Sequence, residues 1–372
     1  MLHPTYMYVA TALSVCSVIL KMTYGYETQH EAGDPLISLA DRTLLYFVKT
    51  VTPLTWAVDF IPQLSHLPKD FPGFSFHETA RVAKKLVEGH AEIPYSFVRS
   101  RTADESHRPS YVSWLIEKLS GESGVSPDDE RVIKWSAATM YAAIADTTTL
   151  AVRSVILALV VFPEVQRKAQ EEIDRVVGSR RLPDFKDREN LPYIEAMIKE
   201  SVRWIPAAPV SMPRVATEDL TYGDYLISKG TVLYPSVWWF LHDPETYTDP
   251  ECFKPERYLE PLNEPEPRYA FGFGRRACPG KFLTGDMLFI LISRMVAVFE
   301  FSKAVDDKGI EIEVQVKIDP GMITRLKDFA YRVKPRSVER GELVKSLCAK
   351  QDKEESDGMS IEKSVREAME CQ

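Results

Sequence analysis

The sequence contains little cysteine and has no excess of positive charge. It has five cysteines among 372 residues, and they stand far apart as Cys16, Cys252, Cys278, Cys348 and Cys371. An odd number of scattered cysteines without a preceding secretory signal argues against a disulfide framework and indicates a reducing compartment. The formal net charge is −8, so no overall positive field attracts nucleic acid. We therefore expect no nucleic-acid partner.

Long apolar runs and internal repeats are also missing. The best membrane candidate, MYVATALSVCSVIL at 7–20, has 14 residues, whereas a spanning helix needs about 20. It also lacks the basic flank and small-residue cleavage site of a signal peptide. We expect a core helix there and no transmembrane anchor in this chain. With 45% apolar and 27% charged residues, the chain can bury a large core.

Helical patterns dominate what is present. A run from about Val125 to Val161 opens with SPDD, in which Ser126 can cap the helix and Pro127 suits its first turn. We predict further helices at 163–177, 191–204 and 281–298. The segments 211–222 and 225–237 look like strands, with a turn at Lys229-Gly230. This pattern predicts a mainly α fold with a small β component over 1–336, followed at 337–372 by a charged tail that need not fold.

The segment 52–76, TPLTWAVDFIPQLSHLPKDFPGFSF, is rich in proline and aromatic residues. Its prolines exclude one continuous helix. Its aromatic side chains suit a lid over an apolar pocket, a patch that contacts a membrane surface, or ordinary core packing.

The stretch FGFGRRACPGKFL (271–283) places one cysteine among glycines, arginines and a proline. GFGRRA (272–277) fits a loose dinucleotide-binding pattern, but the preceding PLNEPEPRYA (261–270) has three prolines that cannot pair inside a sheet. Zinc is disfavoured because no second Cys or His lies within a few residues. A cysteine before a helix, flanked by glycines, suits a lone metal-binding thiolate. An inert buried thiol stays open as the alternative.

In this motif the chain resembles the cytochrome P450 monooxygenases, most closely the fungal membrane-bound type. The family signature Phe-x-x-Gly-x-Arg-x-Cys-x-Gly is filled by Phe271, Gly274, Arg276, Cys278 and Gly280. The resemblance implies that Cys278 is the axial thiolate of a haem b iron, that Phe271 shields the sulfur, and that Arg276 pairs with a haem propionate.

The resemblance extends the haem-contacting set to Gly272 and Gly280 in the same loop and to Arg214. In PVSMPRV (209–215), relatives usually carry His-Arg after the proline, and here only Arg214 is present.

A second constellation consists of Glu200 and Arg203 in IKESVRW (198–204) and Arg257 in PERY (255–258). The i, i+3 spacing puts Glu200 and Arg203 on one helical face. By the resemblance, the three residues form a buried ion network that fixes the cysteine loop. Their expected role is structural.

A third constellation interrupts the long helix in MYAAIADTTTLAV (140–152). A threonine hydroxyl can bond to the carbonyl four residues earlier, which for Thr147 is that of Ala143. The resemblance assigns oxygen activation to Thr147 and proton relay to Asp146. One position departs from the family motif, because its glycine is replaced by Ile144, a branched side chain that would intrude where oxygen needs room.

The resemblance begins at the family's middle helices, so the anchor, the hinge, most of the first sheet and the early helices have no counterpart in this chain. It implies monooxygenation of an apolar organic substrate with O2, electrons from an NADPH-dependent reductase, a role in secondary metabolism, and a place on the cytosolic face of the endoplasmic reticulum membrane. The alternative is a truncated or degenerate, non-catalytic copy of the same fold.

Overall fold

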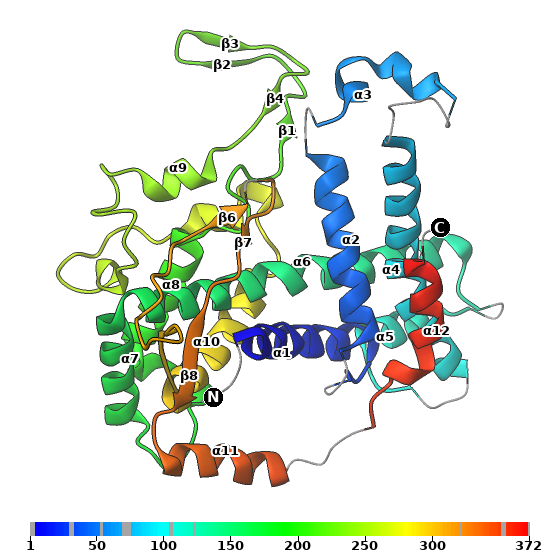
Figure 1. The fold of residues 1–372 in the computed structure, drawn as a ribbon. Coiled ribbons are helices and arrows are strands. Elements are labelled where there is room, and N and C mark those ends of the chain that lie inside the picture. Colours follow the sequence, from blue (N-terminus) through cyan, green and yellow to red (C-terminus); the bar gives the residue numbers. More distant parts are fainter. Residues whose placement is uncertain are drawn as a thin grey trace. The chain divides into compact units, whose positions relative to one another are not determined.

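The computed structural model describes residues 4–29, 33–52, 55–68, 76–103, 107–121, 124–319, 321–350 and 355–370. It forms two compact units. Unit 1 comprises Met1–Tyr8 and Thr148–Gln351, and unit 2 comprises Val9–Thr147 and Asp352–Gln372. The predicted architecture, mainly α with a small β component, is confirmed, since helices dominate both units and the strands form only two-stranded sheets (Figure 1).

The long helix α6 (Pro127–Val161) contributes to both units. Its start is confirmed as predicted, because the Asp129 backbone N–H donates to the Ser126 hydroxyl over 3.1 Å and Pro127 opens the helix. The first half of α6 buries Ile133, Ala137 and Tyr141 in the core of unit 2. The second half buries an almost continuous apolar run, Val155 to Val160, in the core of unit 1.

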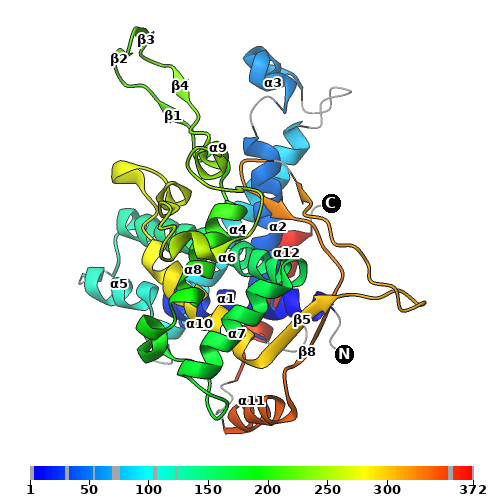
Figure 2. The same cartoon turned by 90° about the vertical axis from the view of Figure 1, so that its left-hand side faces the viewer.

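Unit 1 is built on three further helices: α7 (Pro163–Val176), α8 (Pro192–Trp204) and α10 (Lys281–Val298). They pack against one another, as Figures 1 and 2 show, and bury Ile194, Phe289 and Val296 between them. The predicted helices at 163–177, 191–204 and 281–298 are thereby confirmed. Proline at the first position fixes the start of α7 and α8. The antiparallel strands β5 (Phe299–Lys303) and β8 (Tyr331–Pro335) complete this core.

The predicted strands around 211–237 form a projecting arm of unit 1, visible in Figures 1 and 2. β1 (Arg214–Val215) pairs with β4 (Val232–Leu233), and β2 (Leu220–Tyr222) pairs with β3 (Tyr225–Ile227). The turn that joins the paired strands β2 and β3 is Gly223-Asp224, whereas the predicted Lys229-Gly230 turn connects β3 to β4. The arm therefore has two turns, because the strands are shorter than the apolar pattern indicates.

Unit 2 is a bundle of α1 (Pro4–Tyr24), α2 (Pro35–Val51), α4 (Phe76–Ala103) and α5 (Tyr111–Leu119) with the first half of α6. Val15, Cys16, Ile19 and Leu20 of α1 are buried, which confirms the predicted core helix. Among the described residues, α6 is the one helix long and apolar enough to cross a membrane, and 72% of its apolar window is buried in the protein.

The C-terminal segment differs from the expectation of a tail that need not fold. It contains α11 (Val338–Lys350) in unit 1 and α12 (Gly358–Met369) in unit 2. Helix α12 buries Ile361, Val365 and Ala368, an i, i+4, i+7 stripe, against α2 and α4. An apolar stripe this short is difficult to recognise in a sequence rich in charged residues.

The proline-rich segment 52–76 is broken as predicted. Its described part holds α3 (Ala57–Phe60) and the 3-10 turn η1 (Pro62–His66), and 53–54 and 69–75 lie outside the described residues. Phe60 and Ile61 are exposed rather than packed in a core. The remaining elements are α9 (Val237–His242), η2 (Phe185–Asn190), η3 (Pro255–Tyr258), η4 (Arg268–Phe271), η5 (Gly274–Arg276), β6 (Ile318–Asp319) and β7 (Arg325–Leu326).

Candidate haem-binding site

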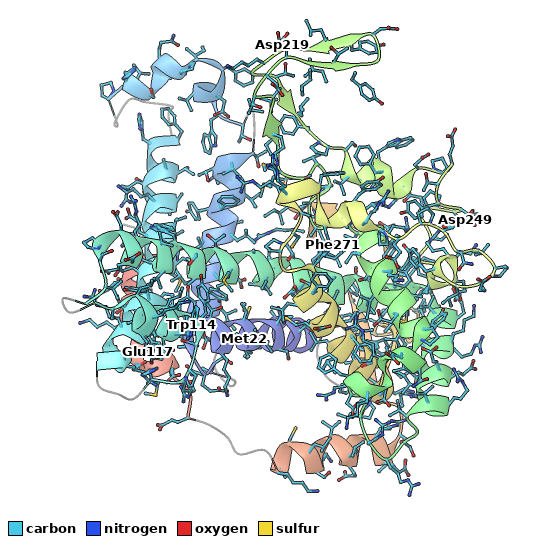
Figure 3. The ribbon with its side chains drawn as sticks, turned by 180° about the vertical axis from the view of Figure 1, so that it is seen from behind. Met22, Trp114, Glu117, Asp219, Asp249 and Phe271 are labelled. Carbon is cyan, nitrogen blue, oxygen red and sulfur yellow. The ribbon has the colours of Figure 1, made fainter. Side chains whose placement is uncertain are left out.

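The cysteine loop, defined here as residues 271–280, connects η4 to α10 and carries Phe271, which is labelled in Figure 3. The Cys278 backbone N–H donates to the Phe271 carbonyl over 2.7 Å and closes the loop. Gly272 and Gly274 have φ of +79° and +54°, a left-handed conformation that a residue with a Cβ adopts only under strain. The glycines of the motif are therefore needed for the turn that presents Cys278.

The sulfur of Cys278 lies at the start of a helix. Gly280 is the residue before α10, and a Cβ added there would lie 3.8 Å from the Cys278 sulfur. The unsatisfied N–H groups at a helix start favour a nearby anion. The loop thus offers a thiolate from a position where its negative charge is favoured.

Two polar groups of the loop are available for a ligand. The Cys278 thiol is exposed, which does not fit an inert buried cysteine. The Arg276 guanidinium is also exposed, and it forms no ion pair with any residue that the structure describes. A soft thiolate two residues after a guanidinium with no described ion pair suits a metal cofactor that carries carboxylates. Haem has both an iron ion and two carboxylates. No cluster of three or more His, Cys, Asp or Glu side chains with metal-binding geometry occurs in the described ranges.

Helix α8 and the segment 254–264 form the ion network, which we define as Glu200, Arg203, Arg257 and Glu264. Glu200, Arg203 and Arg257 have fully buried side chains. The Glu200 carboxylate accepts from Arg203 Nε at 2.8 Å and from Arg257 Nε at 3.1 Å. The structure thereby brings together the three residues that the sequence placed in one network.

Further donors saturate Glu200. Its carboxylate also accepts the Arg203 Nη2 hydrogen over 2.9 Å, the Lys254 backbone N–H over 2.9 Å and the Tyr258 hydroxyl over 3.1 Å. Burial is the main cause that raises the pKa of Tyr258, so its hydroxyl stays protonated and donates.

Two carboxylates balance the two buried arginines. Glu264 accepts from Arg257 Nη1, and the remaining guanidinium hydrogens reach carbonyls, such as Leu241 O at 2.8 Å from Arg203 and Thr248 O at 2.9 Å from Arg257. Burial lowers the pKa of Arg257, but Glu200 and Glu264 outweigh it and raise that pKa overall. Glu264 and Tyr258 were not identified from the sequence. Tyr258 follows Arg257 directly in PERY. Glu264 lies in an irregular loop in which no motif or periodicity identifies it.

Helix α8, which carries Glu200, also lines a cavity that the cysteine loop borders. This cavity of about 540 Å³ is bordered by Ile198 and Val202 of α8 and by Phe271, Ala277 and Phe282. Lys199 of α8 forms an ion pair with Glu266, just ahead of the loop. Helix α8 therefore carries part of the ion network and lines the same cavity as the cysteine loop.

The polar residues that interrupt the apolar sequence of α6 lie inside this helix. The Thr147 hydroxyl donates to the Ala143 carbonyl over 2.8 Å, which confirms the predicted back-bond. Asp146 is half-buried. Thr148 is fully buried, and its hydroxyl has no hydrogen-bond partner among the described residues. Ile144 packs against the core of unit 2.

No described contact ties Arg214 to the loop, and the same holds for Asp146 and Thr147 of α6. Arg214 lies on β1 and is exposed, and its side chain donates to the carbonyl of the adjacent Pro213 over 3.2 Å.

In a comparison with known protein families, the sequence model of the family described as Cytochrome P450 matches residues 4–325. The chain belongs to the cytochrome P450 family. This P450 is 45% identical to the multifunctional cytochrome P450 monooxygenase af510 of Aspergillus fumigatus, over 94% of this chain and 66% of that protein. It is 46% identical to the cytochrome P450 monooxygenase CLM2 of Gibberella zeae, over 89% of this chain and 63% of that protein. It is 38% identical to the O-methylsterigmatocystin oxidoreductase of Aspergillus flavus, over 88% of this chain and 62% of that protein. The chain thus spans slightly less than two thirds of the length of these relatives.

Proposed function

We propose that this P450 is a haem-thiolate monooxygenase that inserts one oxygen atom of O2 into an apolar organic substrate. The observation that carries the proposal is the exposed Cys278 at the start of α10, two residues after Arg276, which forms no ion pair with the residues that the structure describes. We also propose that an NADPH-dependent reductase supplies the electrons and that the protein acts in secondary metabolism. The relative named for O-methylsterigmatocystin supports a small organic substrate.

Haem b, when bound, supplies the iron chemistry that cleaves O2. Cys278 would bind the iron, and Phe271 would shield the Cys278 sulfur from water. Arg276, with Gly272 and Gly280 allowing close approach of the backbone, would hold the edge of the cofactor, and Arg214 is a further candidate for a propionate.

On α6, Asp146 would relay protons and Thr147 would hold a water molecule. The Thr147 hydroxyl donates its hydrogen to Ala143 O, so its lone pairs remain free to accept a hydrogen bond. A hydroxyl fixed in this way can hold a water molecule in one orientation, which is what a directed proton transfer requires.

Glu200, Arg203 and Arg257 would support the site without touching the cofactor. For localisation, we propose the cytosolic face of the endoplasmic reticulum membrane, with 52–76 in contact with the membrane surface. The exposed Phe60 and Ile61 support this contact.

The experiment is expression of the full chain with excess haem precursor, followed by measurement of haem per polypeptide and of turnover with a P450 reductase, NADPH and O2. We expect about one reducible haem per chain and NADPH-dependent product formation. A chain that holds no haem would instead be a non-catalytic copy of the fold, and the proposal would be wrong.

A further inference from the structure

An extended stretch of unit 1 follows β5 and takes no part in the site described above. We call residues 310–318 the edge segment. Their sequence, IEIEVQVKI, alternates strictly between apolar and polar residues, which is the pattern of a β-strand with one apolar face. Near one end of the segment, the Ile312 N–H donates to the Ala304 carbonyl over 2.8 Å. Near the other end, the Lys317 carbonyl accepts from the Lys327 N–H over 2.9 Å.

The middle of the edge segment, residues 313–316, has no backbone hydrogen bond with any residue that the structure describes. The neighbouring strand β5 cannot supply one, because both of its edges are occupied. One edge pairs with β8. On the other edge, the Gln166 side-chain amide accepts from the Phe301 N–H at 2.8 Å and donates to the Phe301 carbonyl at 3.0 Å. Residues 313–316 therefore form an open strand edge, which another strand can pair with.

The apolar side chains of the edge segment are only partly covered. Ile310 is 62% exposed, and Ile312, Val316 and Ile318 are 40%, 46% and 44% exposed. Val314, at the centre, is buried in the core of unit 1. An open edge that carries exposed apolar residues recruits other strands, unless charges or prolines block it. The only proline beside this segment is Pro320, two residues beyond its end.

The apolar residues of the edge segment are self-complementary in one antiparallel register. In this register two copies meet with Val314 of one opposite Val314 of the other. Ile312 then faces Val316, and Ile310 faces Ile318, so that every apolar residue of one copy faces an apolar residue of the other. Such cross-strand pairs are the unit that stabilises a sheet.

The charged residues favour the same register. Glu311 of each copy faces Lys317 of the other, which gives two ion pairs across the dimer. Both residues are exposed, and neither forms an ion pair within the part of its own chain that the structure describes. Glu313 faces Gln315, and the Glu313 charge is already balanced by Lys303, whose Nζ lies 3.0 Å from the Glu313 carboxylate. No like charges meet within the edge segment in this register.

Other antiparallel registers are less favourable. A shift of one residue places the apolar side chains of one copy opposite the polar side chains of the other. Pairing centred on Glu313 places this carboxylate opposite itself. Pairing centred on Gln315 places Glu311 opposite Asp319, which is a like-charge contact. The sequence of the edge segment therefore selects the register centred on Val314.

We propose that two copies of this chain associate through antiparallel pairing of their edge segments, with Val314 at the two-fold axis. The same surface is used by both copies, so the assembly closes as a dimer and does not grow further. Backbone hydrogen bonds between residues 313 and 315 of the two copies supply the pairing, and the two Glu311–Lys317 pairs fix the register. An interface built on one short strand pair is small, and the dimer is weak and concentration-dependent.

Sedimentation velocity of the full chain over a concentration series tests this dimer. We expect a reversible monomer–dimer equilibrium for the wild type. Glu311→Lys and Lys317→Glu, each alone, place two like-charge pairs across the dimer and should raise its Kd by about tenfold or more. The double variant Glu311→Lys/Lys317→Glu exchanges the two charges, so it restores both ion pairs and should return the Kd to the wild-type value. An equimolar mixture of the two single variants should form a heterodimer for the same reason.

The matched control is Glu218→Lys, which makes the same charge reversal at an exposed residue between β1 and β2 and should leave the Kd unchanged. A wild-type chain that stays monomeric at every concentration overturns the proposal. A single reversal at 311 or 317 that associates as strongly as the wild type also overturns it, since another surface would then join the copies. So does a double variant that fails to recover association. The measurement needs no turnover, so its result is independent of the proposed monooxygenase activity.

Discussion

Replacing Glu200 by glutamine tests whether the ion network supports the fold. The Glu200 carboxylate is fully buried and accepts hydrogen bonds from Arg203, Arg257, Tyr258 and the Lys254 backbone. Both of its oxygens face donors, so the amide nitrogen of glutamine meets donor hydrogens in either orientation. The substitution also leaves two buried arginines opposite one carboxylate, Glu264.

Breaking a buried pair in this way costs about 3–5 kcal/mol in the free energy of unfolding. Urea denaturation of the purified proteins measures that change. The matched control is Glu171→Gln, which removes an exposed ion pair with Arg167 at 2.6 Å and should cost less than about 1 kcal/mol.

We also expect Glu200→Gln to lower the yield of soluble, haem-loaded protein. A loss of stability no larger than that of Glu171→Gln would refute the supporting role. So would a normal yield of haem-loaded protein whose turnover is lost, because Glu200 would then act in the reaction itself.

Two further predictions concern α6 and the core of unit 2. Ile144→Gly should raise the fraction of NADPH consumption that ends in product. It should also lower stability by about 1 kcal/mol or more, because glycine has a lower helix propensity and the packing of Ile144 against the core of unit 2 is lost. Unchanged or lower coupling, measured as product per NADPH, counts against steric hindrance by Ile144. Burial lowers the pKa of His90 to about 4, and its ring is stacked on Tyr141 at 5.1 Å. The unfolded chain binds a proton at His90 below about pH 6.5 and the folded chain does not, so stability is complete above that pH and falls by about 3 kcal/mol as the pH approaches 4. Denaturation of His90→Phe across this range should lack that loss, and an identical loss in the variant would show that His90 is not its source.

The helices were predictable because their signals are local. Pro163 and Pro192 occupy the first positions of α7 and α8, and no glycine or proline interrupts α6 after Pro127. The pairing of Glu200 with Arg203 also follows from local spacing along one helix.

The features that the sequence did not predict depend on tertiary contacts. Glu264 approaches Arg257 because an irregular loop folds back, and no periodicity marks it. Helix α12 is fixed by Asp357, which is 4% exposed and accepts from Arg101 and Arg108 at 2.7 Å each. Those partners lie about 250 residues earlier, so the composition of 337–372 alone indicates a tail.

The central claim is that the Cys278 thiolate binds haem iron, and the spectrum of the reduced protein with carbon monoxide tests it most directly. We predict that the purified full chain, supplied with haem, gives the Soret band typical of a thiolate ligand. Cys278→Ala should lack that band, whereas Cys348→Ala, which removes another exposed cysteine, should keep it. Survival of the thiolate band in Cys278→Ala would contradict the assignment.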